Sequence, residues 1–338
     1  MKHSIPILML LSEPFTEHQL SEVRAVSPRV AIEQRIVARG EIIEPEAWAE
    51  VEVLYSLRHL PEPGQAPKLK WVQAHFAGVN RWLGHPALAG VTLTTASGVH
   101  AVRMGEYTTQ MMLAFAHQMP RLWRAQAARE WAKDWGNGAF RELRGATLAV
   151  AGYGSIGREA ARQARALGMR VLASKRDPSR TADTGWCVPG TGDPNGELPV
   201  RFFGPDDWHA MLAEADYVLV AAPLTSGTRH LIDRAALRAM RPGAVLINVA
   251  RGDLVDEAAL IEALQSGHLG GAALDVFAQE PLPAKSQLWD LPNVILTPHI
   301  AGLTPHYNER ALALFAENLR HYLAGQPLLN VVDPAAGY

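Results

Sequence analysis

The sequence predicts an α/β protein with two domains, each built on an open parallel sheet covered by helices. Two observations support this fold class. Short apolar runs alternate with stretches of helical length along most of the chain, and such alternation requires right-handed crossovers between parallel strands. The apolar runs are also nearly uninterrupted by polar residues, which suits strands covered on both faces. At 338 residues the chain is too long for one ordinary core, so two domains are expected.

Composition and charge exclude several classes of protein. Apolar residues make up 48% and charged residues 20%, with a net charge of −2, so nothing favours nucleic acid or an anionic membrane as a partner. The apolar stretches stay short of the ~20 residues that a membrane span needs. The single cysteine, Cys187, forms no intramolecular disulfide and is either an incidental loop residue or a reactive thiol. We therefore expect a cytoplasmic protein.

The first domain is predicted from its four apolar runs and from the C-terminal segment. Strands are expected at residues 5–11, 51–57, 70–74 and 91–95, with helical stretches at 16–25 and 45–50. A final helix at 305–323 and an extended tail at 327–334 follow the second domain, and they are expected to return to the first. Residues 1–101, completed by 304–338, are thus predicted to form a smaller, flavodoxin-like α/β domain.

A long helix is predicted at residues 102–128. It carries methionines and aromatic residues at helical spacing, a stripe that is usually plain core. Trp123, Trp131 and Trp135 lie at its end or beyond it, and aromatic residues with methionine are also enriched at subunit interfaces. The segment therefore suits either a core helix or a subunit interface.

The second domain, residues 102–303, has the more regular pattern. Strands are expected at 147–151, 171–174, 217–222, 244–249, 271–274 and 294–297, with helical segments between them and a helix at 155–167. Residues 177–203 hold four glycines and four prolines and are expected to form a long loop. The arrangement predicts a Rossmann-type, doubly wound parallel sheet.

A glycine turn between the first strand and helix of this domain predicts a dinucleotide site. Gly152 permits a tight turn, Gly154 lets the backbone approach a pyrophosphate, and Gly157 lets the helix pack on the sheet. The N–H groups near Ser155 and Ile156, at the helix start, would face the phosphates.

Residues at the end of the next strand are expected to determine whether the protein binds NAD or NADP. Lys175 and Arg176 stand where an acid would bind the ribose hydroxyls of NAD, and cations there suit the 2′-phosphate of NADP. Asp177 could restore NAD binding if the loop shifts. NADP is favoured over NAD.

Three polar residues follow later strands and supply the chemistry for reducing a 2-oxo acid. Arg251 can bind a carboxylate in a bidentate, planar way. His299 can donate a proton, because imidazole titrates in the right range. Glu280 can orient the ring and stabilise its charged form. Asp275 also ends a strand and is either a nicotinamide contact or an ordinary strand-end acid. No metal is expected at this site.

Five stretches in order and at matching spacing carry a family resemblance. They are residues 152–157, 216–232 (DYVLVAAPLTSGTRHLI), 240–256 (MRPGAVLINVARGDLVD), 274–281 (LDVFAQEP) and 297–302 (TPHIAG). At these residues the chain resembles the D-isomer-specific 2-hydroxyacid dehydrogenases. The resemblance implies Arg251 as substrate-orienting residue, His299 as acid/base with Glu280 as its partner, and Asp275 near the nicotinamide.

The resemblance also implies binding residues and an assembly. The backbone at Ala77 and Gly78 is expected to hold the substrate carboxylate, in a cleft between the domains. Family members are usually dimers built through the nucleotide domain. Further cofactor contacts are implied at Pro223, Thr228, Val249, Ala250, His299 and Gly302.

Within the family, residues 280–283 with Leu288 and Trp289, together with the cation pair at 175–176, resemble the glyoxylate/hydroxypyruvate reductase branch. The predicted activity is hydride transfer between NAD(P)H and a small 2-oxo acid, giving the D-2-hydroxy acid. Two alternatives stay open: a formate- or phosphite-type dehydrogenase of the same fold, and a non-enzymatic NAD(H)-sensing interaction protein like the transcriptional corepressors that resemble the family.

Overall fold

The computed structural model describes residues 4–79, 81–131 and 140–334, and the chain divides into two compact units. The first comprises Met1–Val99, Thr184–Val188 and Thr304–Tyr338. The second comprises His100–Asp183 and Pro189–Leu303. Both are α/β units, as expected.

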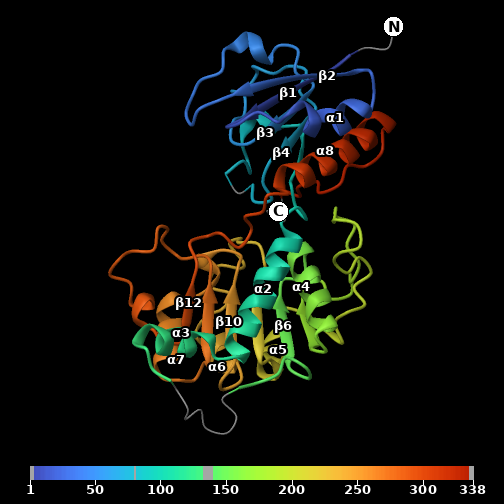
Figure 1. Cartoon of the computed structure of the whole chain (residues 1–338). Helices are drawn as coiled ribbons and strands as arrows, with labels where there is room; N and C mark the ends of the chain where they lie inside the picture. Colours follow the sequence, from blue (N-terminus) through green and yellow to red (C-terminus); the bar gives the residue numbers. More distant parts are fainter. Residues whose placement is uncertain (1–3, 80, 132–139, 335–338) are drawn as a thin grey trace. The chain divides into compact units, whose positions relative to one another are not determined.

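The first unit is built on a five-stranded parallel sheet in the order β2-β1-β3-β4-β5 (Figure 1). Its strands are β1 (Ile5–Leu11), β2 (Val30–Ile36), β3 (Val53–Ser56), β4 (Trp71–Ala74) and β5 (Thr92–Thr94). Its helices are α1 (Glu17–Ala25) and α8 (Tyr307–Ala324), with 3₁₀ turns η1 (Pro45–Trp48) and η2 (Pro86–Leu88).

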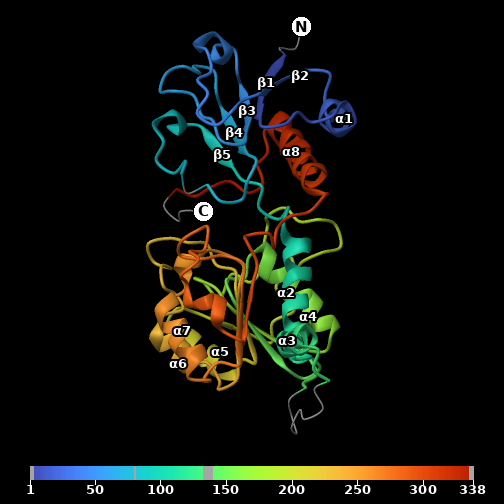
Figure 2. The same ribbon diagram turned by 60° about the vertical axis from the view of Figure 1, so that its left-hand side comes forward.

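Alternation along the central strand β1 fills a core on each face of this sheet. Ile5, Ile7 and Met9 pack with residues of α1 and α8 on one face, where Figure 2 shows both helices. Leu8 and Leu10 point to the opposite face and pack with residues of η1 and the connecting loops. The C-terminal helix is therefore part of the first unit.

Strand β2 is absent from the expected strands. Its sequence mixes three charged or polar residues with apolar ones, and none of its residues is buried. It lies at the edge of the sheet, paired only with β1 among the described strands. Edge strands often carry charged side chains, and such a strand has no apolar run to reveal it.

The second unit holds a seven-stranded parallel sheet in the order β12-β11-β10-β9-β6-β7-β8 (Figure 1). The strands are β6 (Thr147–Ala151), β7 (Arg170–Ser174), β8 (Arg201–Phe203), β9 (Tyr217–Val220), β10 (Val245–Asn248), β11 (Gly271–Leu274) and β12 (Val294–Leu296).

Helices cover both faces of this sheet. They are α2 (Ala101–Ala116), α3 (Met119–Ala128), α4 (Ser155–Ala166), α5 (Trp208–Glu214), α6 (Arg234–Ala239) and α7 (Glu257–Gln265), with 3₁₀ turns η3 (Gly252–Leu254) and η4 (Gln287–Asp290). Helices α2 and α4 share one core with the sheet, and α5, α6 and α7 share the core on the other face (Figures 1 and 2). The doubly wound parallel sheet is confirmed.

The prediction of one helix over residues 102–128 is wrong. Helix α2 ends at Ala116, and α3 begins at Met119 after Gln118, whose φ of 55° is left-handed. Pro120 follows, and proline lacks the N–H that an uninterrupted helix would use and clashes with the preceding turn. The chain therefore starts a second helix instead of extending the first.

The prediction of an unbroken loop over residues 177–203 is also corrected. Its last residues form β8, which pairs in parallel with β7 and extends the sheet. Its middle, Thr184–Val188, groups with the first unit. There Trp186 packs against Ala96 and Val99, and its backbone N–H donates to Asn330 Oδ1 at 3.1 Å.

Residues 4–79, 81–131 and 140–334 show neither a membrane-spanning helix nor a candidate metal cluster. None of the helices there combines the length and apolar character that a bilayer span needs. None of the His, Cys, Asp and Glu side chains described gathers into a group of three or more that could hold a metal ion. Cys187 is a half-buried free thiol.

Candidate active site

The carboxyl ends of the strands in the second unit form one edge, because every neighbouring pair is parallel. The predicted site residues of this unit all follow a strand directly or closely and therefore gather at this edge. Gly152–Gly157 follows β6, Lys175 follows β7, Pro223 follows β9, Arg251 follows β10, Asp275 follows β11 and His299 follows β12. Strand order reverses direction between β6 and β9, the place where open α/β sheets bind ligands.

The glycine turn has two positions that only glycine can occupy. Gly152 has a φ of 98°, and a Cβ there would lie 2.5 Å from the backbone nitrogen of Ala222. A Cβ on Gly157 would lie 2.6 Å from the carbonyl oxygen of Gly152. The start of α4 therefore packs directly on the backbone that follows β6, and this backbone packs on the segment that follows β9.

Gly154 has a different surrounding. It is the N-cap of α4, and a Cβ built on it would meet nothing within 4 Å. The turn is therefore open on this side, and the first N–H groups of α4, around Ser155 and Ile156, begin there. A helix start that is open and carries no side chain fits the pyrophosphate of a nicotinamide dinucleotide.

Lys175, the predicted 2′-phosphate ligand, is held by the segment that follows it. Its Nζ donates to the carbonyl oxygen of Arg180. Burial lowers the pKa of Lys175, and the nearby Arg158 charge lowers it further. Arg176 and Asp177 follow as exposed residues, and Asp177 accepts hydrogen bonds from the N–H and hydroxyl of Ser179.

The segment 177–203 is fixed to the glycine turn by residues that sequence reasoning missed. Tyr153 lies inside the turn, and its hydroxyl donates to Asp193 Oδ2 at 2.6 Å. Arg158 on α4 is only 3% exposed, donates to the carbonyl oxygens of Asp193 and Thr181, and pairs with Asp183 at 3.1 Å. Nothing local in the sequence marks these partners, because they lie 23 to 40 positions apart.

Arg251 is placed by the end of β10. The buried Asn248 donates from Nδ2 to the carbonyl oxygen of Arg251 at 3.0 Å and accepts from the N–H of Ala250 at 3.1 Å. The Arg251 side chain is exposed, and its Nη1 donates to the Ala250 carbonyl oxygen at 2.6 Å. One buried amide therefore fixes the backbone that presents the guanidinium.

Gly252 joins this turn to the segment after β11. A Cβ on Gly252 would lie 1.9 Å from the carbonyl carbon of Phe277, so the two backbones are in direct contact. The N–H of Phe277 in turn donates to Glu280 Oε1 at 3.1 Å. The backbone carrying Arg251 and the backbone carrying Glu280 are thus packed together.

Glu280 and His299 form the hydrogen-bonded pair of the site. Glu280 Oε2 lies 2.8 Å from His299 Nδ1, while Oε1 is held by Phe277. The His299 side chain is 51% exposed, so the imidazole is accessible although one nitrogen is engaged. The structure brings this pair and the Arg251 turn to the same edge of one unit.

Asp275 holds the loop that carries His299. It is 1% exposed, and its carboxylate accepts from Thr297 Oγ1 at 2.6 Å and from the N–H groups of Ile300 and Ala301 at 2.9 Å. His299 itself adopts a left-handed φ of 56° within this loop. In the structure, Asp275 therefore anchors the loop that carries His299. Its contact with a nicotinamide stays a prediction.

Helix α2 supports the same loop. Tyr107 shares a 2.7 Å hydrogen bond with Thr297, and burial raises the pKa of Tyr107 to about 12, so its hydroxyl stays protonated. His100 Nδ1 lies 3.0 Å from the carbonyl oxygen of Gly302. Both contacts span about 200 positions of sequence, and sequence reasoning gave neither residue a role.

The remaining predicted residues have simpler surroundings. Thr228 Oγ1 donates to the Pro223 carbonyl oxygen at 2.6 Å, which closes the loop after β9. Val249 and Ala250 lie between β10 and Arg251. Ala77 and Gly78 belong to the first unit, where they form an exposed loop after β4.

Comparison with known proteins identifies related chains. The sequence profile described as D-isomer specific 2-hydroxyacid dehydrogenase, NAD binding domain, matches residues 109–301. The (S)-sulfolactate dehydrogenase of Chromohalobacter salexigens is 40% identical over 243 residues, which cover 70% of this chain and 69% of the relative. The glyoxylate reductase of Thermofilum pendens is 34% identical over 265 residues, 77% and 74% of the two chains.

A solved structure matches the whole chain. A D-isomer specific 2-hydroxyacid dehydrogenase from Xanthobacter autotrophicus, in complex with NADPH and MES, superposes with a TM-score of 0.79 at 31% identity. The match covers 99% of this chain and 100% of that one.

Proposed function

The chain belongs to the D-isomer specific 2-hydroxyacid dehydrogenase family and is an NAD(P)-dependent oxidoreductase, and on this premise we propose that it reduces a small 2-oxo acid such as glyoxylate or hydroxypyruvate to the D-2-hydroxy acid. The observation that carries the proposal is the 2.8 Å Glu280–His299 pair beside the turn of Arg251.

Each side chain has one part in the reaction. Arg251 binds the substrate carboxylate and polarises the neighbouring carbonyl group. Because His299 Nδ1 faces Glu280, Nε2 is the nitrogen that donates a proton to the carbonyl oxygen as it becomes an alkoxide. Glu280 orients the ring and stabilises the imidazolium form. The bound nicotinamide dinucleotide, on the glycine turn, supplies the hydride.

We propose that the two units divide this work. The second unit binds the cofactor through Gly152, Gly154, Ser155, Ile156 and Gly157 and through the loops at Pro223, Thr228, Val249, Ala250 and Gly302. The first unit binds the substrate carboxylate through the backbone N–H groups at Ala77 and Gly78. The exposure of this loop at the carboxyl end of β4 supports the assignment.

The test is a steady-state screen of 2-oxo acids with NADH and with NADPH. The panel includes glyoxylate, hydroxypyruvate, pyruvate and the 2-oxo acid that corresponds to sulfolactate, with formate and phosphite assayed in the oxidative direction. Turnover of a small 2-oxo acid supports the proposal, and turnover of formate or phosphite contradicts it. If no compound of the panel is turned over while the protein still binds the cofactor, the result would favour the non-enzymatic NAD(H)-sensing alternative.

We propose NADP as the preferred cofactor. Lys175 and Arg176 follow β7, where the second ribose of the dinucleotide binds in this fold. The similar chain from Xanthobacter autotrophicus was solved with NADPH. The ratio of kcat/KM for NADPH and NADH measures the preference, and Arg176→Glu should shift this ratio toward NADH. A wild-type preference for NADH would contradict the assignment.

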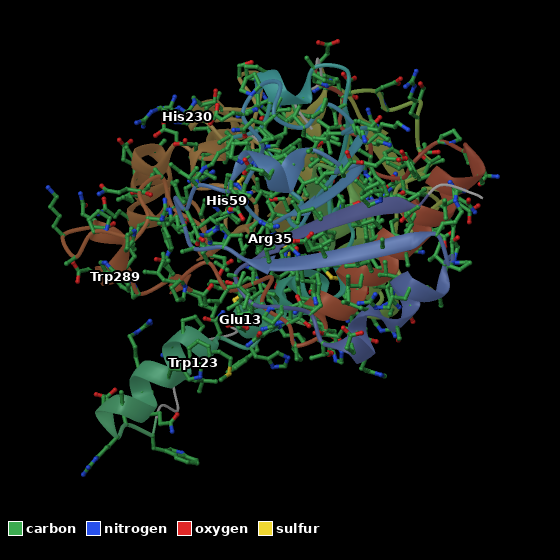
Figure 3. All side chains as sticks on the ribbon, turned by 90° about the horizontal axis from the view of Figure 1, so that it is seen from above. Glu13, Arg35, His59, Trp123, His230 and Trp289 are labelled. Atoms are coloured by element: carbon green, nitrogen blue, oxygen red, sulfur yellow. The ribbon has the colours of Figure 1, made fainter. Side chains whose placement is uncertain are left out.

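We also propose a homodimer formed through α3 and its flanking residues, in a cytoplasmic enzyme without nucleic-acid or membrane partners. None of the ten residues of α3 is buried, and Trp123 and Trp131 are 47% and 87% exposed. Figure 3 labels Trp123 on α3. Trp135 lies outside the described residues.

Light scattering after gel filtration tests the dimer. The wild type should have twice the mass of the chain, and Trp123→Asp should shift it toward the monomer, because a charge would be buried without a partner. Trp289→Asp is the matched control, since Trp289 is 55% exposed in the same unit. A monomeric wild type would contradict this assembly.

A further inference from the structure

A polar cluster of two buried side chains and one half-buried side chain precedes the Ala77–Gly78 loop in the first unit. Its members are Tyr55 on β3, His75 at the end of β4 and Tyr307 at the start of α8. Tyr55 is 1% exposed and His75 is 8% exposed. The three side chains come from positions up to 252 apart in the sequence.

His75 is held at three points. Its Nδ1 lies 2.7 Å from the hydroxyl of Tyr55. Its backbone N–H donates to the carbonyl oxygen of Ser56 at 2.8 Å. Its own carbonyl oxygen accepts a hydrogen bond from the hydroxyl of Tyr307. The rings also pack edge to face, with centroids of His75 and Tyr307 4.9 Å apart and those of His75 and Tyr55 5.6 Å apart.

The third contact controls the direction of the next N–H. A peptide unit is planar, and its C=O and N–H point in opposite directions. When Tyr307 holds the His75 carbonyl, it also sets the orientation of the Phe76 N–H, the first donor of the loop. Phe76 is 40% exposed and Val79, on the far side of the loop, is buried at 6%. The loop is thus a short exposed span between two fixed ends.

Packing alone would not select these residues. Phenylalanine and leucine fill a core without the cost of burying polar groups, whereas hydroxyl and imidazole groups must find partners when they leave water. Burial raises the pKa of both Tyr55 and Tyr307, so both hydroxyls stay neutral and protonated. The cluster is therefore a set of hydrogen bonds that connects two protonated tyrosine hydroxyls, through His75, to the backbone of the loop.

We infer that Tyr55, His75 and Tyr307 are positioning residues that orient the backbone N–H groups of residues 76–78 toward the substrate carboxylate. The inference rests on the proposed function of that loop. None of the three side chains is assigned a contact with the reacting atoms. Their effect is on the affinity for the carboxylate and on the order of the loop.

The experiment compares Tyr307→Phe, Tyr55→Phe and His75→Leu with the wild type and with Tyr322→Phe. Tyr322 is the matched control, because it lies on the same helix and its hydroxyl donates to Glu52 Oε1 at 2.6 Å, in a contact that involves no residue of the loop. His75→Asn is the rescue variant, since its amide can place a polar atom near the position of Nδ1. Three quantities are measured: KM and kcat for the best 2-oxo acid, the Kd for NADPH, and hydrogen exchange of the peptide that covers residues 76–79.

We expect Tyr307→Phe and Tyr55→Phe to raise KM by about tenfold, the effect of one lost hydrogen bond, with a smaller change in kcat and an unchanged Kd for NADPH. Exchange of the 76–79 peptide should become faster by about tenfold. His75→Leu should show both effects more strongly, and His75→Asn should recover most of the loss. Tyr322→Phe should match the wild type in KM and in exchange of this peptide.

Wild-type KM and wild-type exchange in Tyr307→Phe would overturn the inference, and that mild variant settles the question even if His75→Leu does not fold. Equal changes in Tyr322→Phe would also overturn it, because the effect would then be general softening of the unit. A wild-type chain that reduces no 2-oxo acid would overturn the proposed function, and with it the role toward a carboxylate. The exchange data would still show whether the cluster holds the loop.

Discussion

The two sheets present different chemistry at the carboxyl ends of their strands. In the second unit this edge carries charged side chains: Arg251 after β10, Glu280 in the segment after β11 and His299 after β12. In the first unit the loop after β4 is the short, uncharged Phe76–Ala77–Gly78 span, with a hydrogen-bonded cluster of Tyr55, His75 and Tyr307 behind it. Under the proposed function, the same α/β architecture binds an anion in two ways, by a side chain and by the backbone.

The two edges differ in which group is exposed for binding or chemistry after buried side chains have fixed the backbone. In the second unit, buried polar side chains such as Asn248 and Asp275 fix the backbone so that an exposed side chain does the chemistry. In the first unit, the cluster side chains fix the backbone of the loop that we propose as the ligand of the substrate carboxylate. Side-chain chemistry is lost when one residue is replaced, whereas backbone binding depends on the conformation of the loop.

The largest expected effect is on His299. His299→Ala should lower kcat by about a thousandfold, because a positioned general acid contributes ~10²–10⁴-fold. The Kd for NADPH, measured by fluorescence titration, should stay near that of the wild type. A variant with wild-type turnover would contradict the role of His299 as acid and would remove the chemical distinction between the two edges.

Arg251→Lys comes next. Lysine keeps the positive charge but loses the planar, bidentate geometry, so kcat/KM for the 2-oxo acid should fall by about a hundredfold. The loss should appear in KM and in kcat, since Arg251 both binds the carboxylate and polarises the carbonyl. If Arg251→Lys retains wild-type kcat/KM, a positive charge alone is sufficient to bind the substrate carboxylate, and the proposed bidentate contact is wrong.

The sequence could predict the second edge more fully than the first. Arg251, Glu280 and His299 carry chemical groups that stand out after apolar strands, and the glycine spacing at 152–157 marks a turn. The parallel sheets follow from the alternation of apolar runs with stretches of helical length, and a helix that follows the last strand suggests a return to the first domain. Residue type and local spacing suffice to propose these side chains as a site.

The rest depends on contacts that local pattern does not encode. The Tyr307–His75 bond joins positions 232 apart, and Asp193 reaches Tyr153 across 40 positions. Strand β2 has no apolar run because it is an edge strand, and the break between α2 and α3 depends on one left-handed residue, Gln118, just before Pro120. Anchors of this kind become visible only when the fold brings the partners together.

A substitution at Ala77 sharpens the comparison between side-chain and backbone recognition. Ala77→Pro removes one N–H from the loop and restricts the preceding Phe76, so KM for the 2-oxo acid should rise by about tenfold or more. Ala77→Ser changes the side chain but keeps the N–H, and its KM should rise much less. Equal KM values for the two variants would show that the N–H at this position does not bind the substrate.

The smallest expected effect is on the free energy of unfolding, through a contact that attaches segment 177–203 to the second unit. Glu159 on α4 is buried and accepts hydrogen bonds from Arg162, Gln163 and the N–H of Gly192, the last at 2.8 Å. Burial raises the pKa of the Glu159 carboxyl, but the hydrogen bonds from Arg162 and Gln163 outweigh burial and leave the pKa lower than in the unfolded chain.

The sign of the pH dependence follows from that lowered pKa. The Glu159 carboxylate stabilises the folded state fully above its unfolded pKa, and this contribution is lost as the pH falls through the folded value. Glu159→Gln should therefore lower the free energy of unfolding by about 1 kcal/mol near pH 7, and the difference from the wild type should be smaller at an acidic pH below the unfolded pKa of this carboxyl. Urea unfolding at both pH values measures it, with Glu106→Gln as the exposed control on α2. A deficit of equal size at both pH values would show that the shape of the Glu159 side chain, and not its carboxylate charge, attaches the segment.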